Sequence, residues 1–137
     1  MIPIFEPYLS AKEKKYLLQA IDTGWISSQG KFITEFENEF AKKFNRKYAV
    51  ATSNCTTALH LCLVALDIKP GDEVICPNLT FIAPANMISE VGAKIVLVDV
   101  DKKSWNLDPS LVEQAITEKT KAIMVVHAFG VPANMDK

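Results

Sequence analysis

Segments of two different periodicities alternate along this chain of 137 residues. Short runs rich in β-branched and other apolar residues, typical of buried strands, are separated by longer segments in which apolar residues recur at helical spacing. Because single helices separate successive strands, the strands should pair in parallel, with helices on both faces of one α/β sheet. The expected strands lie at 48–52, 73–76, 94–100 and 122–127, and the expected helices at 10–22, 32–45, 56–66, 82–91 and 108–117.

Three of these helices have further distinguishing features in the sequence. Ser10 can cap the first helix by accepting a hydrogen bond from its first turn. In the second helix phenylalanines recur every four residues, at positions 32, 36, 40 and 44, which gives it one apolar face. The helix at 56–66 is instead apolar nearly all round, so we expect it to be buried.

Composition bounds the class of protein. The length fits one domain or part of a larger one, and 49% apolar with 23% charged residues is typical of a globular protein. A net charge of −1 gives no reason to expect a nucleic-acid or membrane partner. Cys55, Cys62 and Cys76 have no metal-site spacing, and we expect them to be reduced thiols in the cytoplasm. The longest apolar run, near 58–66, is too short to span a bilayer.

Parallel α/β sheets bind ligands at the carboxyl ends of their strands. Three segments follow expected strands here, namely residues 53–57, 78–81 and 127–130. We therefore expect these three segments to meet at one edge of the sheet, and any site to lie there.

The segment Ser53–Thr57 admits two interpretations. It joins a strand to a helix N-terminus, where unpaired backbone N–H groups and the helix dipole attract phosphate, and its hydroxyls can add hydrogen bonds. In the alternative, Ser53 or Asn54 simply caps the helix. The glycine-rich fingerprints of nucleoside triphosphate and dinucleotide sites do not occur in the sequence.

Four consecutive blocks resemble one protein family. They are "GWISSQGKFITEFENEFAKKF", "YAVATSNCTTALHLCLVAL", "KPGDEVICPNLTFIAPANMI" and "AIMVVHAFGVPANMDK". In order and spacing they are similar to the start of the DegT/DnrJ/EryC1/StrS family. The resemblance implies the N-terminal part of a fold type I, pyridoxal-phosphate-dependent transferase large domain, with a mostly parallel, incomplete sheet. The implied reaction converts a nucleotide-linked keto sugar to a perosamine-like amino sugar for surface polysaccharide, with glutamate as amino donor.

The resemblance also implies site residues. Ser53, Asn54, Cys55 and Thr56 would bind the cofactor phosphate, mainly through the backbone N–H groups of the last two. Phe81, in "LTFIAPAN", would stack on the pyridine ring. Taken by itself, without the resemblance, Phe81 is better interpreted as a core residue.

The "WISS" stretch resembles the family's sugar-binding mouth, which implies substrate contacts for Trp25, Ser27 and Ser28. Trp25 could instead be a packed anchor of its loop. His127 and Gly130 match an "HxxG" pattern after a strand. We expect a structural role for His127, and we assign no catalytic residue and no metal ligand.

The sequence departs from the family at Cys55, where members commonly have glycine. Either the backbone angles there suit any residue, or phosphate binding is weakened by the added side chain. A catalytic pair of Cys55 with His60 or His127 has no supporting motif. The family's aspartate for the pyridinium nitrogen and its cofactor-binding lysine do not lie within residues 1–137, so we expect this chain to be inactive alone.

Residues 1–46 are thus expected to form N-terminal helices with the substrate-mouth loop, and residues 47–137 the start of the cofactor-binding sheet. Relatives of full length are homodimers, which implies the same here. Two alternatives stay open: a dehydratase of the same family, in which histidine replaces the lysine, and a short non-catalytic binding module.

Overall fold

The computed structural model describes residue 3 and residues 6–137. The chain forms two compact units, residues 1–51 and residues 52–137, and each is described by itself. Within the described ranges no helix has both the length and the apolar character needed to cross a bilayer.

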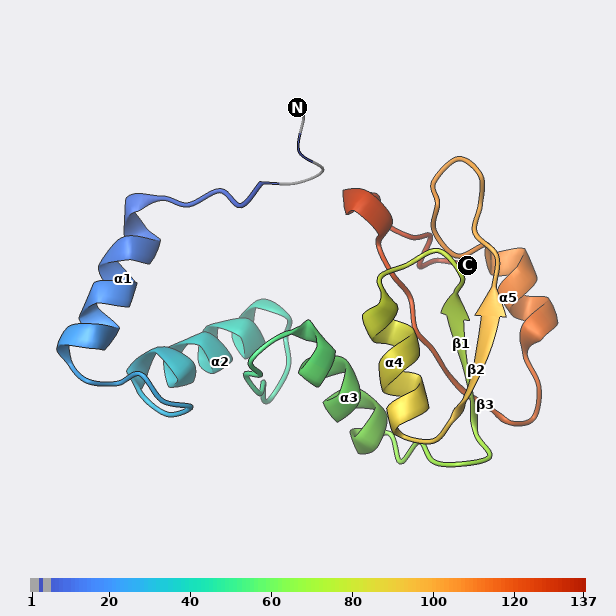
Figure 1. The fold of residues 1–137 in the computed structure, drawn as a ribbon, viewed down its shortest axis with the longest axis horizontal. Coiled ribbons are helices and arrows are strands. Elements are labelled where there is room, and N and C mark those ends of the chain that lie inside the picture. The colour runs from blue at the N-terminus through green and yellow to red at the C-terminus, as the bar shows by residue number, and fades with distance from the viewer. Residues whose placement is uncertain (1–2, 4–5) are drawn as a thin grey trace. The chain divides into compact units, whose positions relative to one another are not determined.

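The first unit contains two helices, α1 (Ala11–Asp22) and α2 (Lys31–Lys43) (Figure 1). Ser10 caps α1 as predicted: its Oγ accepts from the Lys12 N–H at 3.2 Å, and its own N–H donates to Glu13 Oε2 at 2.6 Å. This reciprocal pair is a capping box, which satisfies donors that a helix start leaves free.

The predicted aromatic repeat forms a row of side chains along α2 whose rings contact one another at tilted angles. The ring centroids of Phe36 and Phe40 lie 5.6 Å apart, and those of Phe40 and Phe44 lie 4.5 Å apart. The ring of Tyr16 in α1 packs against the ring of Phe32 in α2, with the two centroids 5.4 Å apart, and this contact joins the two helices. Phe36, Phe40 and Phe44 remain 46–55% exposed, so within this unit the apolar face of α2 is only partly covered.

The prediction of a strand at 48–52 is wrong. This segment has no regular structure, and Val50 is 69% exposed. Its Ala51 N–H donates to Glu37 Oε1 at 2.8 Å and not to a neighbouring strand. A strand exists only where another strand supplies its hydrogen bonds, and no described strand pairs with this segment.

The second unit is a parallel α/β layer structure, as predicted. Its elements are α3 (Cys55–Ala65), β1 (Glu73–Pro77), α4 (Ile82–Glu90), β2 (Lys94–Val98), α5 (Pro109–Ala115), β3 (Thr120–Ile123) and the short 3₁₀ helix η1 (Ala128–Gly130). The described strands are parallel in the order β2-β1-β3. The last strand starts and ends earlier than predicted: its residues Thr120–Ile123 pair with Glu73–Ile75 of β1, and the Met124 N–H still donates to the Ile75 carbonyl at 2.8 Å.

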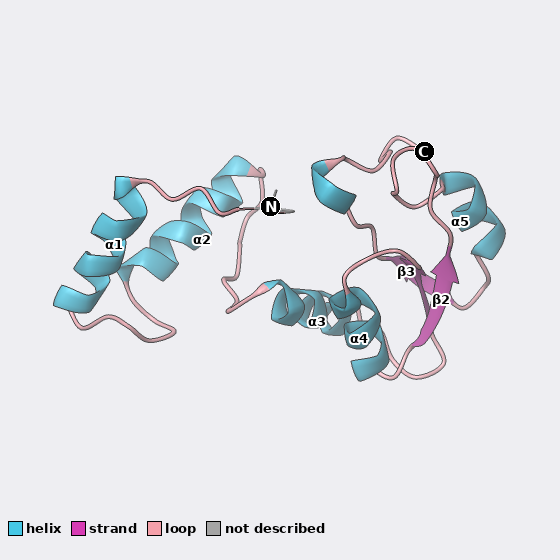
Figure 2. Ribbon diagram, turned by 45° about the horizontal axis from the view of Figure 1, so that its top comes forward, coloured by secondary structure: helices cyan, strands magenta, loops and turns pink. Residues whose placement is uncertain are grey.

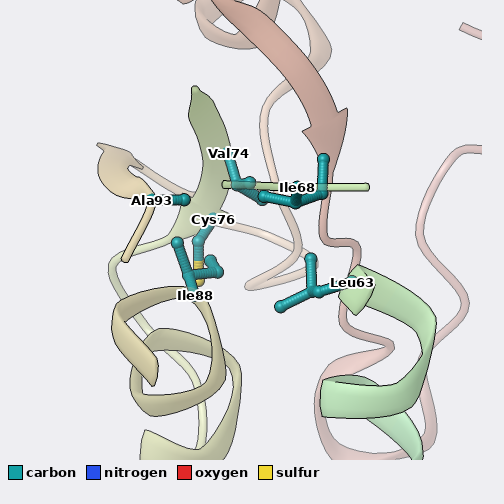
Figure 3. Close-up of a cluster of buried hydrophobic side chains, with 6 residues drawn as sticks. All are labelled: Leu63, Ile68, Val74, Cys76, Ile88 and Ala93. Atoms are coloured by element: carbon teal, nitrogen blue, oxygen red, sulfur yellow. The ribbon is translucent and has the colours of Figure 1, made fainter. Parts of the chain in front are cut away.

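Two cores lie on opposite faces of β1. Val74 and Cys76 point to the side of α3 and α4, where they join Leu63, Ile68, Ile88 and Ala93 (Figure 3). Ile75 points to the other side and packs with Val98 and Leu107 near α5. Successive side chains of this fully buried strand point to opposite faces of the sheet. The strand therefore packs against both helical layers, one formed by α3 and α4 and the other by α5 (Figure 2).

The prediction that α3 is buried nearly all round is wrong. Only Leu63 of this helix is buried, whereas Leu61 and Val64 are 45% and 55% exposed. One side of α3 meets α4 and the core, and its other side has no covering element within this unit.

A buried carboxylate joins the amino ends of the strands. Glu73 is 5% exposed; its Oε1 accepts from Lys94 Nζ at 2.8 Å and its Oε2 from Thr117 Oγ1 at 2.7 Å. The hydrogen bond from Lys94, and after it the one from Thr117, lowers the pKa of Glu73 below its ordinary value of 4.5. Glu73 thereby connects β1 to β2 and to the turn before β3.

The lowered pKa of Glu73 predicts an acid-sensitive contribution to stability. Because the folded pKa is depressed, this contribution is present above about pH 4.5 and is lost as the pH falls through the folded pKa. We expect Glu73→Gln to lower the melting temperature at neutral pH and to converge with wild type in acid. The exposed Glu118→Gln is the matched control, and an equal deficit for Glu73→Gln at all pH values would contradict the prediction.

Residues 1–137 expressed alone should associate. Exposed apolar side chains on α2 and α3, and the outer edges of β2 and β3, offer surfaces on which copies can pair. We expect light scattering after gel filtration to show a concentration-dependent mass, with binding of a hydrophobic dye. A monodisperse monomer with sharp, cooperative thermal unfolding would contradict this.

Candidate functional site

Helices α3 and α4 run against the direction of the strands, so their first residues lie at the end of the unit where the strands finish (Figure 1). The turn at η1 follows β3 at this same end. The three segments that the sequence marked therefore share the carboxyl end of the sheet, the usual ligand position in parallel α/β folds.

Asn54 is the N-cap of α3. Its Oδ1 accepts from the Thr57 N–H at 3.0 Å, and Thr57 Oγ1 donates back to the Asn54 carbonyl at 2.9 Å. Of the two capping residues that the sequence allowed, Asn54 rather than Ser53 takes this role. Capping at Asn54 occupies the third N–H of the helix.

The first two N–H groups of α3 remain free of the cap. In the described part of the chain, the N–H groups of Cys55 and Thr56 have no hydrogen-bond acceptor. The Ser53 hydroxyl lies 3.4 Å from Thr57 Oγ1 and is exposed. The capping and anion-binding interpretations are thus compatible, because they use different donors of one helix terminus.

The backbone at Cys55 does not require glycine. Cys55 is the first residue of α3, and it is not among the residues with positive φ. Its thiol is exposed. Of the two possibilities raised by the cysteine, the structure favours the first, in which the backbone angles suit any residue.

Phe81 directly precedes α4 and is 75% exposed. Its interpretation as a core phenylalanine is therefore wrong, and its ring is free to pack on a ligand. The neighbouring Thr80 Oγ1 is buried and has no partner among the described residues. An aromatic face and an unpaired hydroxyl thus lie side by side in the sequence at the start of α4.

Trp25, Ser27 and Ser28 belong to the first unit. Trp25 is 56% exposed and covers Gly30, where an added Cβ would come within 3.2 Å of the Trp25 Cβ. Trp25 and Ser28 line an open hollow beside α2, whereas Ser27 Oγ accepts from the Gln29 N–H at 3.3 Å within the loop. Trp25 therefore anchors its loop and also presents a ring face.

Sequence reasoning missed Asn106. This residue is 2% exposed, and its amide bonds to the turn that follows β3. A single asparagine in a loop carries no signal of such a role, since its partners lie 22 and 25 residues further along the chain.

Residues 7–137 match the DegT/DnrJ/EryC1/StrS aminotransferase family. The chain belongs to this family. The resemblance seen in the four sequence blocks is thereby confirmed.

Several relatives are similar over nearly the whole chain. The chain is 49% identical to GDP-perosamine synthase of Escherichia coli over 136 residues, which are 99% of the chain. It is 52% identical to GDP-perosamine synthase of Caulobacter vibrioides over 135 residues, which are 98% of the chain. These matches cover 37% and 36% of the relatives, so the chain spans about a third of their length.

Solved structures of related enzymes have the same fold. A putative sugar aminotransferase of Streptococcus pneumoniae in its PLP form matches with a TM-score of 0.87 and 36% identity, over 98% of this chain and 34% of that one. A GDP-4-keto-6-deoxymannose-3-dehydratase matches with a TM-score of 0.86 and 31% identity, over 98% and 36%. The α/β layer structure is therefore the start of a fold type I transferase domain, as the resemblance implied.

Substitutions at Cys55 test its helical backbone. In a helix, glycine is less favourable than alanine by up to about 1 kcal/mol, whereas at a left-handed position glycine is the better residue. In the full-length protein that contains residues 1–137, we expect Cys55→Gly to unfold at lower urea concentration than Cys55→Ala. A more stable Cys55→Gly would show that the segment has the left-handed geometry of a glycine turn.

Proposed function

We propose that the protein containing this chain is a pyridoxal-phosphate-dependent aminotransferase. It would transfer an amino group, with glutamate as donor, to a nucleotide-linked keto sugar and make a perosamine-like sugar for surface polysaccharide. The observation that carries the proposal is the N-terminus of α3, with two free N–H groups and nearby hydroxyls, in a chain of this aminotransferase family.

The residues present fit the cofactor. Its phosphate would be held by the N–H groups of Cys55 and Thr56, with the hydroxyls of Ser53 and Thr56 beside them. The positive end of the α3 dipole favours the dianion, and Asn54 keeps the helix start in place. Phe81, exposed at the start of α4, would stack on the pyridine ring.

The cofactor, when bound, supplies the electron sink that amino transfer needs. The role of the residues in this chain is to bind and orient it. A phosphate fixed at one helix terminus and a ring face on Phe81 would together restrict both position and tilt. No residue within 1–137 is proposed to move a proton in the reaction.

Trp25, Ser27 and Ser28 are proposed to contact the sugar substrate. Trp25 has a ring face available and a fixed loop beneath it, and Ser28 lines the same hollow. An aromatic face with adjacent hydroxyls suits a sugar, which presents both C–H and O–H groups.

The whole protein is further proposed to be a cytoplasmic homodimer. Its free cysteines, two exposed and one buried, support a reducing compartment. The partly uncovered apolar faces of α2 and α3 support burial against further protein surface.

A product assay tests the function. The full-length protein, given pyridoxal phosphate, glutamate and GDP-4-keto-6-deoxymannose, should form a GDP-amino sugar detectable by mass spectrometry. Residues 1–137 alone should form none. Thr56→Val should weaken cofactor binding by roughly tenfold or more, because a hydrogen bond to a charged group contributes about 1.5–3 kcal/mol. Unchanged affinity in Thr56→Val would contradict the contact between the Thr56 hydroxyl and the phosphate.

The dehydratase of similar fold supports a second candidate. If the protein is such a dehydratase, the same assay would release ammonia. The sugar product would then be a deoxy-keto sugar that carries no amino group. A full-length protein that binds the cofactor and converts no sugar would instead favour the non-catalytic binding module.

A further inference from the structure

Asn106 ties together two segments that are distant in sequence. Its Oδ1 accepts from the Ala128 N–H at 2.8 Å and its Nδ2 donates to the Val131 carbonyl at 3.0 Å. The side chain is 98% removed from solvent, since the residue is 2% exposed. One buried amide therefore closes both ends of the turn around η1.

The segments that Asn106 joins have unusual backbone conformations. Trp105 has φ of 60° and Phe129 has φ of 51°, left-handed values that large side chains rarely adopt. Their rings meet edge to face with centroids 5.6 Å apart. Such conformations persist only where surrounding contacts hold them, and they concentrate at functional sites.

The turn also fixes His127. Its Nδ1 accepts from the Ala133 N–H at 3.0 Å, so in the neutral ring the proton lies on Nε2. Nε2 has no partner among the described residues, and the side chain is exposed. The turn thus presents one oriented N–H donor.

The topology places this donor at the candidate site. β3 is the neighbour of β1, and the Met124 N–H still bonds to the Ile75 carbonyl. Three residues later the chain reaches His127, while β1 continues to Pro77 and then toward Phe81. His127 therefore follows its strand at the same end of the sheet as the segment that carries Phe81.

We propose that Asn106 is a positioning residue, which holds the turn at 127–131 so that Nε2 of His127 donates a hydrogen bond to an anionic oxygen of the bound cofactor. This inference rests on the proposed function, because it takes pyridoxal phosphate as the ligand. It gives His127 a binding contact where sequence reasoning expected only a structural one.

A double-mutant cycle tests this inference. In the full-length protein, pyridoxal phosphate is titrated by absorbance into wild type, His127→Phe, Asn106→Ala and the double variant. Each single variant should raise the Kd roughly tenfold or more, as expected for the loss of one hydrogen bond to a charged oxygen. If Asn106 acts through His127, the Kd of the double variant should agree within about twofold with the Kd of the single variant that binds less tightly.

Other outcomes overturn the inference. Multiplied effects in the double variant, or an unchanged Kd in Asn106→Ala, would show that Asn106 does not act through His127. If Asn106→Ala fails to fold, Asn106→Asp replaces it, because that variant keeps the acceptor for the Ala128 N–H and replaces the donor to the Val131 carbonyl by a carboxylate oxygen. Wild type that binds no pyridoxal phosphate would overturn the proposed function, whereas binding that ignores all variants would overturn this inference alone.

Glu73→Gln is the control for lost stability. Glu73 lies at the amino end of the sheet, where its carboxylate joins β1 to Lys94 and Thr117. This variant should melt at lower temperature and leave the Kd within about twofold of wild type. A weakening of binding equal to that of Asn106→Ala would reduce the effect of Asn106 to a general loss of stability and would overturn its positioning role.

Discussion

Complete burial of β1 is the constraint on which the second unit depends. All five residues of this strand are buried, and successive side chains enter two different cores. A strand in this position needs parallel neighbours and helices on both faces, which in turn bring every strand end to one side. The candidate site follows from this arrangement, because the helix starts at Asn54 and Phe81 and the turn at His127 come to the same end.

The proposed binding groups at this end are backbone donors that the helix cap leaves free. Asn54 satisfies one N–H of α3 and leaves the two before it available, so helix stability and anion binding do not compete. On the other side of β1 a buried side-chain amide does the corresponding work for the turn after β3. Both side chains, Asn54 and Asn106, hold backbone in a defined position, which binding of the proposed cofactor would require.

The features of the fold that could be predicted from the sequence are those that depend on local patterns. The capping box at Ser10, the phenylalanine row and the parallel order of the strands all depend on residues close in sequence or on simple alternation. The segment around Val50 could not be predicted, because a strand depends on a partner that the described chain does not place there. Asn106 was missed for a related reason: its role depends on contacts with Ala128 and Val131, which only the fold brings near.

The three cysteines differ in their accessibility to reagents, and this difference can be used to detect local unfolding of the second unit. Cys55 and Cys62 are exposed on α3, whereas Cys76 lies inside the core and burial raises the pKa of its thiol. Since alkylating reagents attack thiolates that they can reach, two thiols are open to modification while the third is shielded as long as β1 stays in its sheet. The number of alkylated thiols, counted by mass, therefore measures opening of the central strand without any engineered label.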